Sequence, residues 1–300
     1  MNQKGLVSVV LPVYNGERFL SEAIESILRQ SYPNFELIVI NDGSIDGTGS
    51  ILSKYLGVDS RVKVIEQENK GIVSALNEGI SRSKGEYIAR MDADDIAYSN
   101  RLEEQVNFLE RNSDYVLVGS FYKILGTDKL VTVPCGDLDC RALLLFTSCL
   151  AHPTAMFRRS TIAKHKLCYD KNLQYVEDYD LWVRIARFGK IGNVPKALLA
   201  YRLHGNQITQ TKKDLIADRY LNVVLQSMEG NGFGHLYEKY HNFYRLVTNT
   251  NTSLYKALVA LLLVIFMFFK DRKLSNRKYV LRYILRVWGS FLKSKVVPNK

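Results

Sequence analysis

Three carboxylates stand close together in the segment Asp92-Ala-Asp-Asp95, directly after an expected strand at residues 87–90. Two like unit charges about 4 Å apart repel one another by roughly 4 kcal/mol at an effective dielectric constant of about 20. A hard divalent cation that is shared with a diphosphate would compensate these charges. Alternatively, Asp94 or Asp95 could cap a helix that we expect to begin near Ser99. The pattern alone leaves both interpretations open.

A second polar turn, Asn41-Asp-Gly-Ser44, follows an expected strand at residues 36–40. The Asp42 carboxylate could accept hydrogen bonds from a uracil imide or a ribose hydroxyl, although a plain Asx turn would explain the same residues. The turn has neither the glycine pattern of dinucleotide-binding folds nor that of P-loop nucleoside triphosphatases. We therefore expect neither of those two kinds of nucleotide site.

These two turns need a framework that brings them to one place. Over residues 7–90, short apolar runs alternate with segments in which apolar residues recur at helical spacing. This order of strands and helices is typical of βαβ units and a parallel sheet. Ligands of such sheets bind beyond the carboxyl ends of the strands, where both turns fall, so one crevice can collect them. The expected strands are residues 7–11, 36–40, 62–65 and 87–90, and the expected helices are residues 19–30 and 71–83.

The pattern is looser beyond residue 115. We expect strands at residues 116–118 and 154–157, and a helix at residues 180–188 with acidic residues at its start. Residues 207–245 are mostly polar helix, with a break at the glycine-rich residues 230–234.

The net charge of +11 comes almost entirely from the end of the chain. The last 31 residues contain ten lysines and arginines and one acid, so residues 1–269 carry only +2. A nucleic-acid-binding domain needs its basic residues on the folded surface, so we expect no nucleic-acid partner. The apolar fraction of 47% and the charged fraction of 24% exclude a wholly disordered chain.

Residues 257–269 are apolar without a break, and these thirteen residues are fewer than the roughly 18–20 that span a bilayer. In residues 278–292 basic residues recur at four-residue spacing among apolar and aromatic ones, as in helices that lie on an anionic membrane surface. The alternative is a buried core helix followed by a solvated basic end. We expect residues 254–300 to associate with a membrane.

Five motifs along the chain together resemble the family 2 glycosyltransferases, the large inverting group with a GT-A nucleotide-diphosphate-sugar-binding fold. The resemblance is strong over residues 6–111 and weaker to about residue 210. It implies an α/β fold with a Rossmann-like, mostly parallel sheet, helices on both faces, and here a C-terminal helical membrane-associating segment. The motifs are residues 7–16, 26–33, 36–44, 69–71 and 85–95.

The resemblance also implies a division of the chain. We expect a catalytic domain at residues 1–205, with a nucleotide-sugar-binding half at 1–111 and an acceptor and base half at 112–205. A helical extension at 206–253 and the membrane-associating tail at 254–300 follow.

The same resemblance implies roles for single residues. Tyr14 would lie against the pyrimidine and Asp42 would hydrogen-bond it. Asp92 and Asp94 match the D-x-D motif, which contacts the ribose and a Mn²⁺ or Mg²⁺ ion that bridges the diphosphate, so these two are the expected metal ligands. The expected nucleotide-sugar-binding residues are Pro12, Tyr14, Asn15, Asp42, Arg90, Asp92, Ala93, Asp94, Arg202 and His204.

The segment Glu177-Asp-Tyr-Asp-Leu-Trp182 resembles the part of the family that carries the general base. There the aspartate after the glutamate is the usual base, which implies Asp178 here, with Glu177 as the second candidate. A positioned base contributes about 10²–10⁴-fold to the rate. Alternatively, both acids only offset the dipole of the helix at residues 180–188.

No Q-x-x-R-W motif occurs, so the resemblance is to non-processive members that add one sugar. The expected function is transfer of a hexosyl or N-acetylhexosaminyl group from a nucleotide-diphosphate-sugar, most simply a UDP-sugar, to a saccharide acceptor. The basic tail suggests a polyprenyl-diphosphate-linked acceptor in the synthesis of lipopolysaccharide, capsule or exopolysaccharide. Two alternatives are a sugar-nucleotidyltransferase, whose glycine-rich basic loop is missing after the first strand, and a non-catalytic membrane scaffold.

The four cysteines show no C-x-x-C spacing, and the chain does not open on a secretory signal peptide. We therefore expect neither a disulfide framework nor a zinc cluster, and a reducing compartment. Together with the tail, this predicts a peripheral or monotopic protein on the cytoplasmic face of the inner membrane.

Overall fold

The computed structural model describes residues 3–203, 213–230 and 237–248, together with residues 232, 234, 281, 285 and 288. The chain divides into two compact units. The sheet unit contains Met1–Gly136 and Leu150–Lys213, and the helical unit contains Asp137–Cys149 and Asp214–Lys300. Every described residue for which we predicted a site role belongs to the sheet unit.

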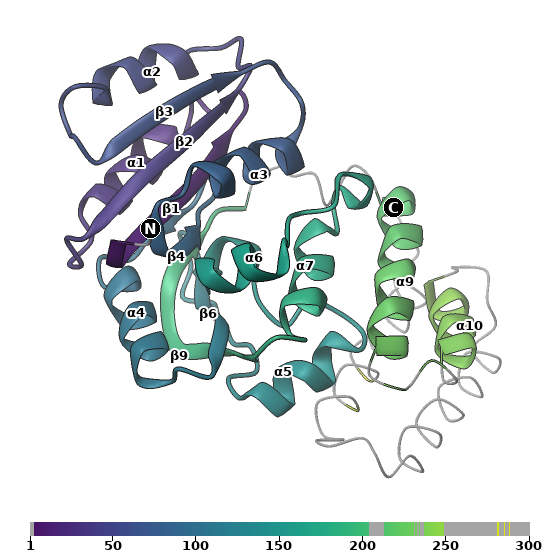
Figure 1. Cartoon of the computed structure of the whole chain (residues 1–300). Coiled ribbons are helices and arrows are strands. Elements are labelled where there is room, and N and C mark those ends of the chain that lie inside the picture. Colours follow the sequence, from purple (N-terminus) through teal and green to yellow (C-terminus); the bar gives the residue numbers. More distant parts are fainter. Residues whose placement is uncertain are drawn as a thin grey trace. The chain divides into compact units, whose positions relative to one another are not determined.

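The first half of the sheet unit is the alternating βαβ arrangement that the sequence predicts (Figure 1). Its four long strands run parallel in the order β3-β2-β1-β4. The elements are β1 (Gln3–Val13), α1 (Leu20–Leu28), β2 (Phe35–Asp42), α2 (Thr48–Tyr55), β3 (Val62–Gln67), α3 (Ile72–Arg82) and β4 (Gly85–Arg90).

Helices cover both faces of this parallel part because alternate strand residues point to opposite sides. One set of strand residues, which includes Leu37 and Val39, packs in a cluster with α1 and α4 (Arg101–Arg111). The intervening residues Ile38 and Ile40 pack with Ala75 of α3 on the other face. A Cβ on Gly79 of α3 would meet the Val10 side chain at 2.3 Å, so only glycine permits this close approach.

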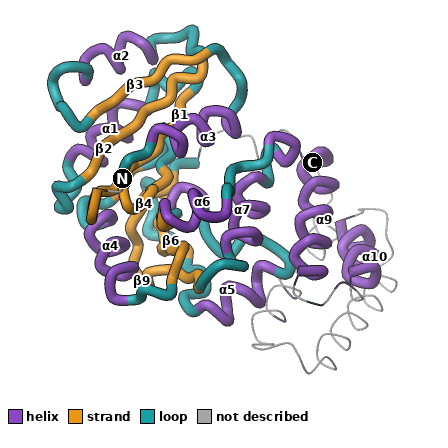
Figure 2. The backbone as a smooth tube through the Cα atoms, in the orientation of Figure 1, coloured by secondary structure: helices purple, strands orange, loops and turns teal. Residues whose placement is uncertain are grey.

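The second half of the sheet is mixed, and our expectation of a mostly parallel sheet is wrong there. β8 runs antiparallel to both β4 and β6, and β9 is parallel to β6 but antiparallel to β5. Figure 2 distinguishes the strands, such as β6 and β9, from the helices around them. Strand direction depends on where the connecting chain re-enters the sheet, and the loosely patterned residues before β8 gave no sign of it. The strands are β5 (Ile96–Ala97), β6 (Tyr115–Ile124), β7 (Leu130–Val131), β8 (Met156–Arg158) and β9 (Lys190–Tyr201).

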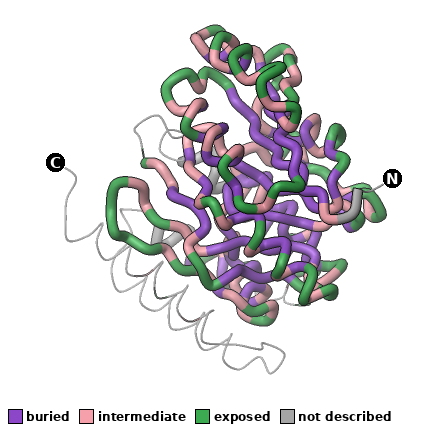
Figure 3. Tube along the Cα trace, turned by 90° about the vertical axis from the view of Figure 1, so that its left-hand side faces the viewer, coloured by how far each residue is buried: buried purple, intermediate pink, exposed green. Residues whose placement is uncertain are grey.

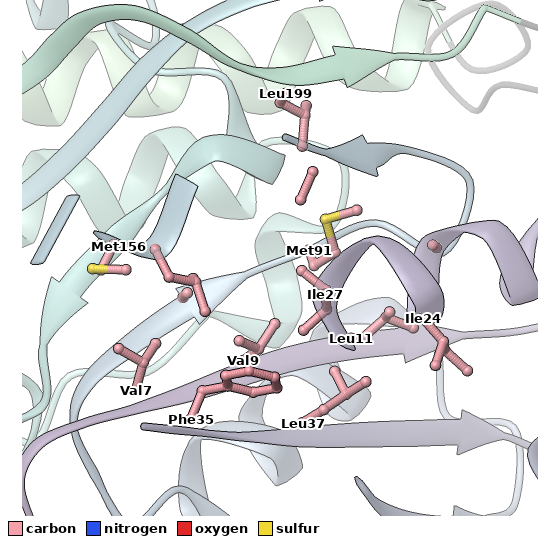
Figure 4. Close-up of a cluster of buried hydrophobic side chains, with 14 of the residues drawn as sticks. Val7, Val9, Leu11, Ile24, Ile27, Phe35, Leu37, Met91, Met156 and Leu199 are labelled. Carbon is pink, nitrogen blue, oxygen red and sulfur yellow. The ribbon is translucent and has the colours of Figure 1, made fainter. Parts of the chain in front are cut away.

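The main core lies between the sheet and the helices α1 and α4. Buried residues follow the strands, whereas the connecting turns are more exposed (Figure 3). On α1, buried apolar residues recur three or four positions apart, so one face of the helix packs on the sheet. Figure 4 shows part of this core, with Val7, Val9, Leu11, Ile24, Ile27, Phe35, Leu37, Met91, Met156 and Leu199 labelled.

The helical unit is built from α5 (Asp137–Leu144), α9 (Lys213–Gly230) and α10 (Tyr237–Thr248). α9 and α10 are separated near the glycines at 230–234, as the sequence predicts. The Ser227 hydroxyl donates to the carbonyl of Leu144 (2.6 Å), and the rings of Phe146 and Tyr240 pack with centroids 5.0 Å apart. These contacts hold α5 against the later helices within this unit.

Most of the predicted membrane-associating tail, residues 254–300, lies outside the described residues, so its membrane association stays a prediction. Within the part of the chain that the structure describes, none of the helices combines the length and hydrophobicity needed to cross a membrane.

Candidate functional site

The acidic turn, Asp92 to Asp95, connects β4 to β5 at the carboxyl end of β4. One carboxylate oxygen from each of Asp92, Asp94 and Asp95 lies within 4.8 Å of the others. Both ends of the turn are fixed, because the Met91 amide donates to the Val10 carbonyl (3.0 Å) and β5 pairs with β9. The fold therefore holds three carboxylates close together at the carboxyl end of β4.

The alternative that these acids cap the following helix is wrong. α4 begins at Arg101, and Asn100 occupies its cap position. Asp95 instead accepts a hydrogen bond from the backbone amide of Arg202 (2.8 Å). The acidic residues are thus held by the end of β9 and not by the start of α4.

Two buried arginines balance part of this charge. Arg90 forms an ion pair with Asp92. Burial alone would lower the pKa of Arg90, but the negative charge of Asp92 outweighs this effect and raises the pKa. Arg101 is fully buried, and its guanidinium donates to the Arg90 carbonyl (2.6 Å) and to Gln105 (3.1 Å). Burial, reinforced by the charge of Arg90, lowers the pKa of Arg101 to about 9, so it is a cation at neutral pH.

Asp95 is the most enclosed acid of the turn, with 1% of its surface exposed. Its Oδ2 atom has no hydrogen-bond partner among the described residues. Burial and the nearby charge of Asp92 raise the pKa of Asp95 to about 8. Asp95 is therefore largely protonated at neutral pH, because burial and a neighbouring carboxylate both disfavour its charged form.

The loops after β1 and β2 are joined to each other. The Asn15 amide donates to the Ser44 hydroxyl (2.9 Å), and the Asn15 side-chain oxygen accepts from the Ile45 amide (2.9 Å). Asn15 adopts a left-handed backbone (φ 52°) that this exchange stabilises. Pro12 is buried at the end of β1, whereas the Tyr14 ring is 51% exposed and can stack on a ligand.

Asp42 is buried and holds the loop after β3. Its carboxylate accepts hydrogen bonds from the side chain of Gln67 (2.5 Å) and from the amides of Lys70 and Gly71 (2.9 Å each). Asn41, not Asp42, forms the Asx-type bond, to the Ser44 amide (3.2 Å). Asp42 therefore has a structural task in addition to the base contact that the sequence predicts for it.

The second pair of predicted acids lies in the first turn of α7 (Glu177–Ile185), which begins three residues before the predicted helix. Glu177 is 6% exposed, and burial followed by the charge of Asp178 raises its pKa to about 7. Burial raises the pKa of Asp178 to about 6, although α7 amides and Arg90 oppose it. Both acids can thus exchange a proton near neutral pH.

The fold brings these two acidic groups within electrostatic reach of one another. The charges of Arg90 and Asp92 both act on Asp178, although 86 residues separate Asp92 from it in sequence. Tyr175, just before α7, has a left-handed backbone (φ 79°), a conformation that is retained mainly at sites where geometry matters. The arrangement can therefore combine cation binding with proton removal at neighbouring positions.

Several nearby residues had no place in our predicted site. The His152 ring nitrogen Nε2 and the Tyr169 hydroxyl lie 2.9 Å apart, and both rings contact Trp182 of α7. Tyr169 also exchanges two backbone hydrogen bonds of 2.9 Å with the Asn77 side chain of α3. Burial, together with Arg90, lowers the pKa of His152 well below its usual range, so this residue is neutral and helps to support α7.

The remaining predicted residues differ in their placement. Ala93 is half-buried in the acidic turn. Arg202 lies against that turn, with its guanidinium engaged by neighbouring protein groups. His204 lies outside the described residues.

Comparison with known sequences identifies related proteins. The sequence model of a family described as Glycosyl transferase family 2 matches residues 8–164. An uncharacterized glycosyltransferase of Haemophilus influenzae is 39% identical over 215 residues, covering 67% of each chain. The putative glycosyltransferase EpsE of Bacillus subtilis is 37% identical over 212 residues, which cover 67% of this chain and 74% of EpsE. An uncharacterized glycosyltransferase of Rickettsia prowazekii is 35% identical, and the match spans slightly less than two thirds (66%) of its length.

Solved structures of glycosyltransferases share the fold. Residues 1–349 of Staphylococcus aureus TarS in complex with UDP-GlcNAc give a TM-score of 0.65 at 18% identity, covering 98% of this chain and 89% of that one. The mannosyltransferase PcManGT of Pyrobaculum calidifontis, in complex with GDP-Man and Mn²⁺, gives 0.58 at 16% identity, covering 97% and 76%. These likenesses confirm the predicted α/β fold of GT-A type.

Proposed function

The chain belongs to glycosyl transferase family 2, and from this premise we propose that it moves one sugar from a UDP-sugar to a saccharide acceptor, with inversion at the anomeric carbon. The observation that carries the proposal is the meeting of two acidic groups in the sheet unit. The acidic turn after β4 and the first turn of α7 act on one another through Arg90 and Asp92. One group suits a cation and a diphosphate, and the other suits proton removal.

The donor would bind along the loops that follow β1, β2 and β4. The exposed Tyr14 ring offers a stacking face for a base. Asp42 and the backbone of the loop that it holds would contact the base edge. The complex of TarS with UDP-GlcNAc supports a uridine nucleotide, since that protein has the same fold.

The acidic turn fits a Mn²⁺ or Mg²⁺ ion. Its three carboxylates supply the hard oxygen ligands that both ions prefer, and the buried Asp95 Oδ2 has no protein partner among the described residues. Asp94 and Asp92 would hold the ion, with Asp95 beside them. When bound, such an ion offsets the charge of the departing diphosphate.

We assign the base to Asp178. Its carboxylate would take the proton of the acceptor hydroxyl while that oxygen forms a bond to the anomeric carbon. The bond between this carbon and the diphosphate oxygen breaks on the opposite face, and the nucleoside diphosphate leaves with the electron pair. The α7 backbone amides and the charge of Arg90 keep the Asp178 carboxylate largely ionised at neutral pH in spite of its burial.

The test of the proposed function is a donor panel. The full chain is incubated with UDP-, GDP- and dTDP-sugars and Mn²⁺ or Mg²⁺ in the presence of lipid, and release of the nucleoside diphosphate is measured. We expect release from UDP-sugars that stops when a chelator is added. A chain that neither hydrolyses nor transfers from any of these donors contradicts the proposal.

The acid limb of the pH profile should identify the base. A carboxylate accepts a proton only when ionised, so kcat/KM should fall as the pH drops through about 6, the pKa of Asp178 in the free enzyme. Glu177→Gln should leave this limb in place. A limb centred near pH 7 that disappears in Glu177→Gln would instead assign the base to Glu177.

We further propose that the enzyme works on a lipid-linked acceptor, such as a polyprenyl-diphosphate saccharide of a cell-surface polysaccharide, at the cytoplasmic face of the inner membrane. Support comes from the +9 charge of residues 270–300 and from their spacing among apolar residues. Each basic residue near an anionic leaflet contributes about 1 kcal/mol to binding.

Removal of residues 254–300 should release the protein from membranes. In co-sedimentation with vesicles that contain anionic lipid, we expect the full chain to pellet at low salt and residues 1–253 to stay in the supernatant. Neutral vesicles serve as the control. Pelleting of the shortened chain would place the membrane contact elsewhere in the protein.

A further inference from the structure

Arg202 follows directly on β9 and holds the acidic turn at two points. Its backbone amide donates to Asp95 Oδ1 (2.8 Å). Its side-chain Nε donates to the carbonyl oxygen of Asp94 (2.7 Å). One residue therefore fixes both the Asp95 carboxylate and the peptide group that follows Asp94.

The other end of the Arg202 guanidinium is fixed on α1. Nη2 pairs with the Glu22 carboxylate (2.9 Å), and the guanidinium carbon lies 4.3 Å from the centroid of the Phe19 ring. The Arg202 side chain is 17% exposed. The planar guanidinium thus joins the acidic turn to a helix that lies about 180 residues earlier in the chain.

The short β5 strand explains why the contacts of Arg202 are needed to hold the acidic turn. β5 has two residues, Ile96 and Ala97, which pair with β9, and the Tyr98 amide donates to the Leu198 carbonyl of β9 (3.0 Å). The pairing with β9 and the Met91 bond to Val10 fix the two ends of the turn but not the peptide groups between them. Ligands of a metal site must be held to within about 0.5 Å of a productive geometry. The bond from Arg202 to the Asp94 carbonyl acts inside the turn, because it orients the peptide between Asp94 and Asp95.

We propose that Arg202 is a positioning residue for the acidic turn and not a ligand of the diphosphate, which is the role that we first expected for it. This inference rests on the proposed metal site. Glu22 neutralises the guanidinium, and Phe19 covers one of its faces. A phosphate would have to compete with a carboxylate and an aromatic ring that already hold the same group.

The sign of the effect on cation affinity separates positioning from charge. If Arg202 acted only through its positive charge, its removal would tighten binding of a cation to the nearby carboxylates. If Arg202 positions the ligands, its removal weakens cation binding, and loss of such supporting partners typically costs about 10–100-fold in metal affinity.

The experiment measures Mn²⁺ binding to the full chain without nucleotide, by electron paramagnetic resonance of the free ion. Arg202→Met keeps most of the side-chain stem against Phe19 but removes the donors, and we expect the Kd for Mn²⁺ to rise about tenfold. Arg202→Lys keeps the charge without the planar fork, so we expect a rise of roughly three- to fivefold. This second variant keeps the test decisive if Arg202→Met fails to fold.

Arg18→Met is the matched control, because the Arg18 guanidinium also lies over Phe19 (4.8 Å) but has no hydrogen bond or ion pair to the acidic turn among the described residues. We expect it to bind Mn²⁺ like the wild type. UDP binding in chelator is measured in parallel and should not change in Arg202→Met.

Each contrary result has a distinct meaning. Unchanged or tighter Mn²⁺ binding by both Arg202 variants overturns the positioning role while leaving the proposed function intact. Weaker UDP binding in chelator with unchanged Mn²⁺ affinity makes Arg202 a diphosphate ligand. A wild-type chain that binds no Mn²⁺, alone or with UDP, overturns the proposed metal site and this inference together.

Discussion

Asp178→Asn is expected to lower kcat for sugar transfer by about 10²–10⁴-fold while leaving the affinity for UDP nearly unchanged. The amide has the shape of the carboxylate but does not accept the proton of the acceptor hydroxyl. Because this proton moves only as the transition state forms, the loss should appear in kcat and not in donor binding. The measurement pairs steady-state transfer with calorimetric titration of UDP.

Two neighbouring acids of α7 provide controls for this variant. Glu177→Gln tests the second candidate base, and we expect it to retain most of the activity. Asp180→Asn removes an ion pair with Arg184 on the same helix, so it should lower the melting temperature while kcat is retained. If Asp178→Asn weakens UDP binding as strongly as it lowers kcat, Asp178 is not the base.

The parallel half of the fold could be predicted because the hydropathy of each residue shows whether its own face of the strand or helix is buried. Leu37 and Ile38 lie on opposite sides of β2, and both sides are covered, so the strand is buried throughout and its central residues 37–40 are apolar. The same pattern predicts the acidic turn at the carboxyl end of β4. Local periodicity was sufficient for this part of the site.

The direction of β8 was beyond such reasoning, since it depends on a connection that passes through the helical unit. α7 begins at Glu177, three residues before the predicted start. Glu177 is buried and Asp178 is half-buried, and the hydropathy pattern does not show the burial of polar residues.

The supporting residues of the site were missed for a related reason. Arginine is usually a surface residue, and Arg101 differs only because it lies on the buried face of α4. The contact of Arg202 with Glu22 and the contact of Tyr169 with Asn77 join residues that are distant in sequence. Pairwise contacts of this kind leave no signal in a single sequence.

Asp94→Asn should remove the Mn²⁺-dependent part of UDP binding, with an increase in Kd of at least about 100-fold, or about 2.7 kcal/mol. An amide has one oxygen and no charge, so it is a far weaker partner than a carboxylate for a hard divalent cation. One carboxylate oxygen of Asp94 lies within 4.8 Å of an oxygen of Asp92 and of Asp95, so Asp94 can share an ion with both. Titrations with UDP in Mn²⁺ and in chelator measure the effect.

The titration in chelator separates the loss of metal binding from a loss of direct contacts to UDP. Without metal, wild type and Asp94→Asn should bind UDP equally weakly, since the base contacts come from other loops and Asp92 of the D-x-D motif is unchanged. Asp114→Asn, at an exposed ion pair with Lys190, controls for the loss of one negative charge and should behave like the wild type. If Asp94→Asn still binds UDP more tightly in Mn²⁺ than in chelator, by the same factor as the wild type, another residue holds the ion. Because the three carboxylates lie within 4.8 Å of one another, Asp92 and Asp95 would then be the remaining ligands of this turn.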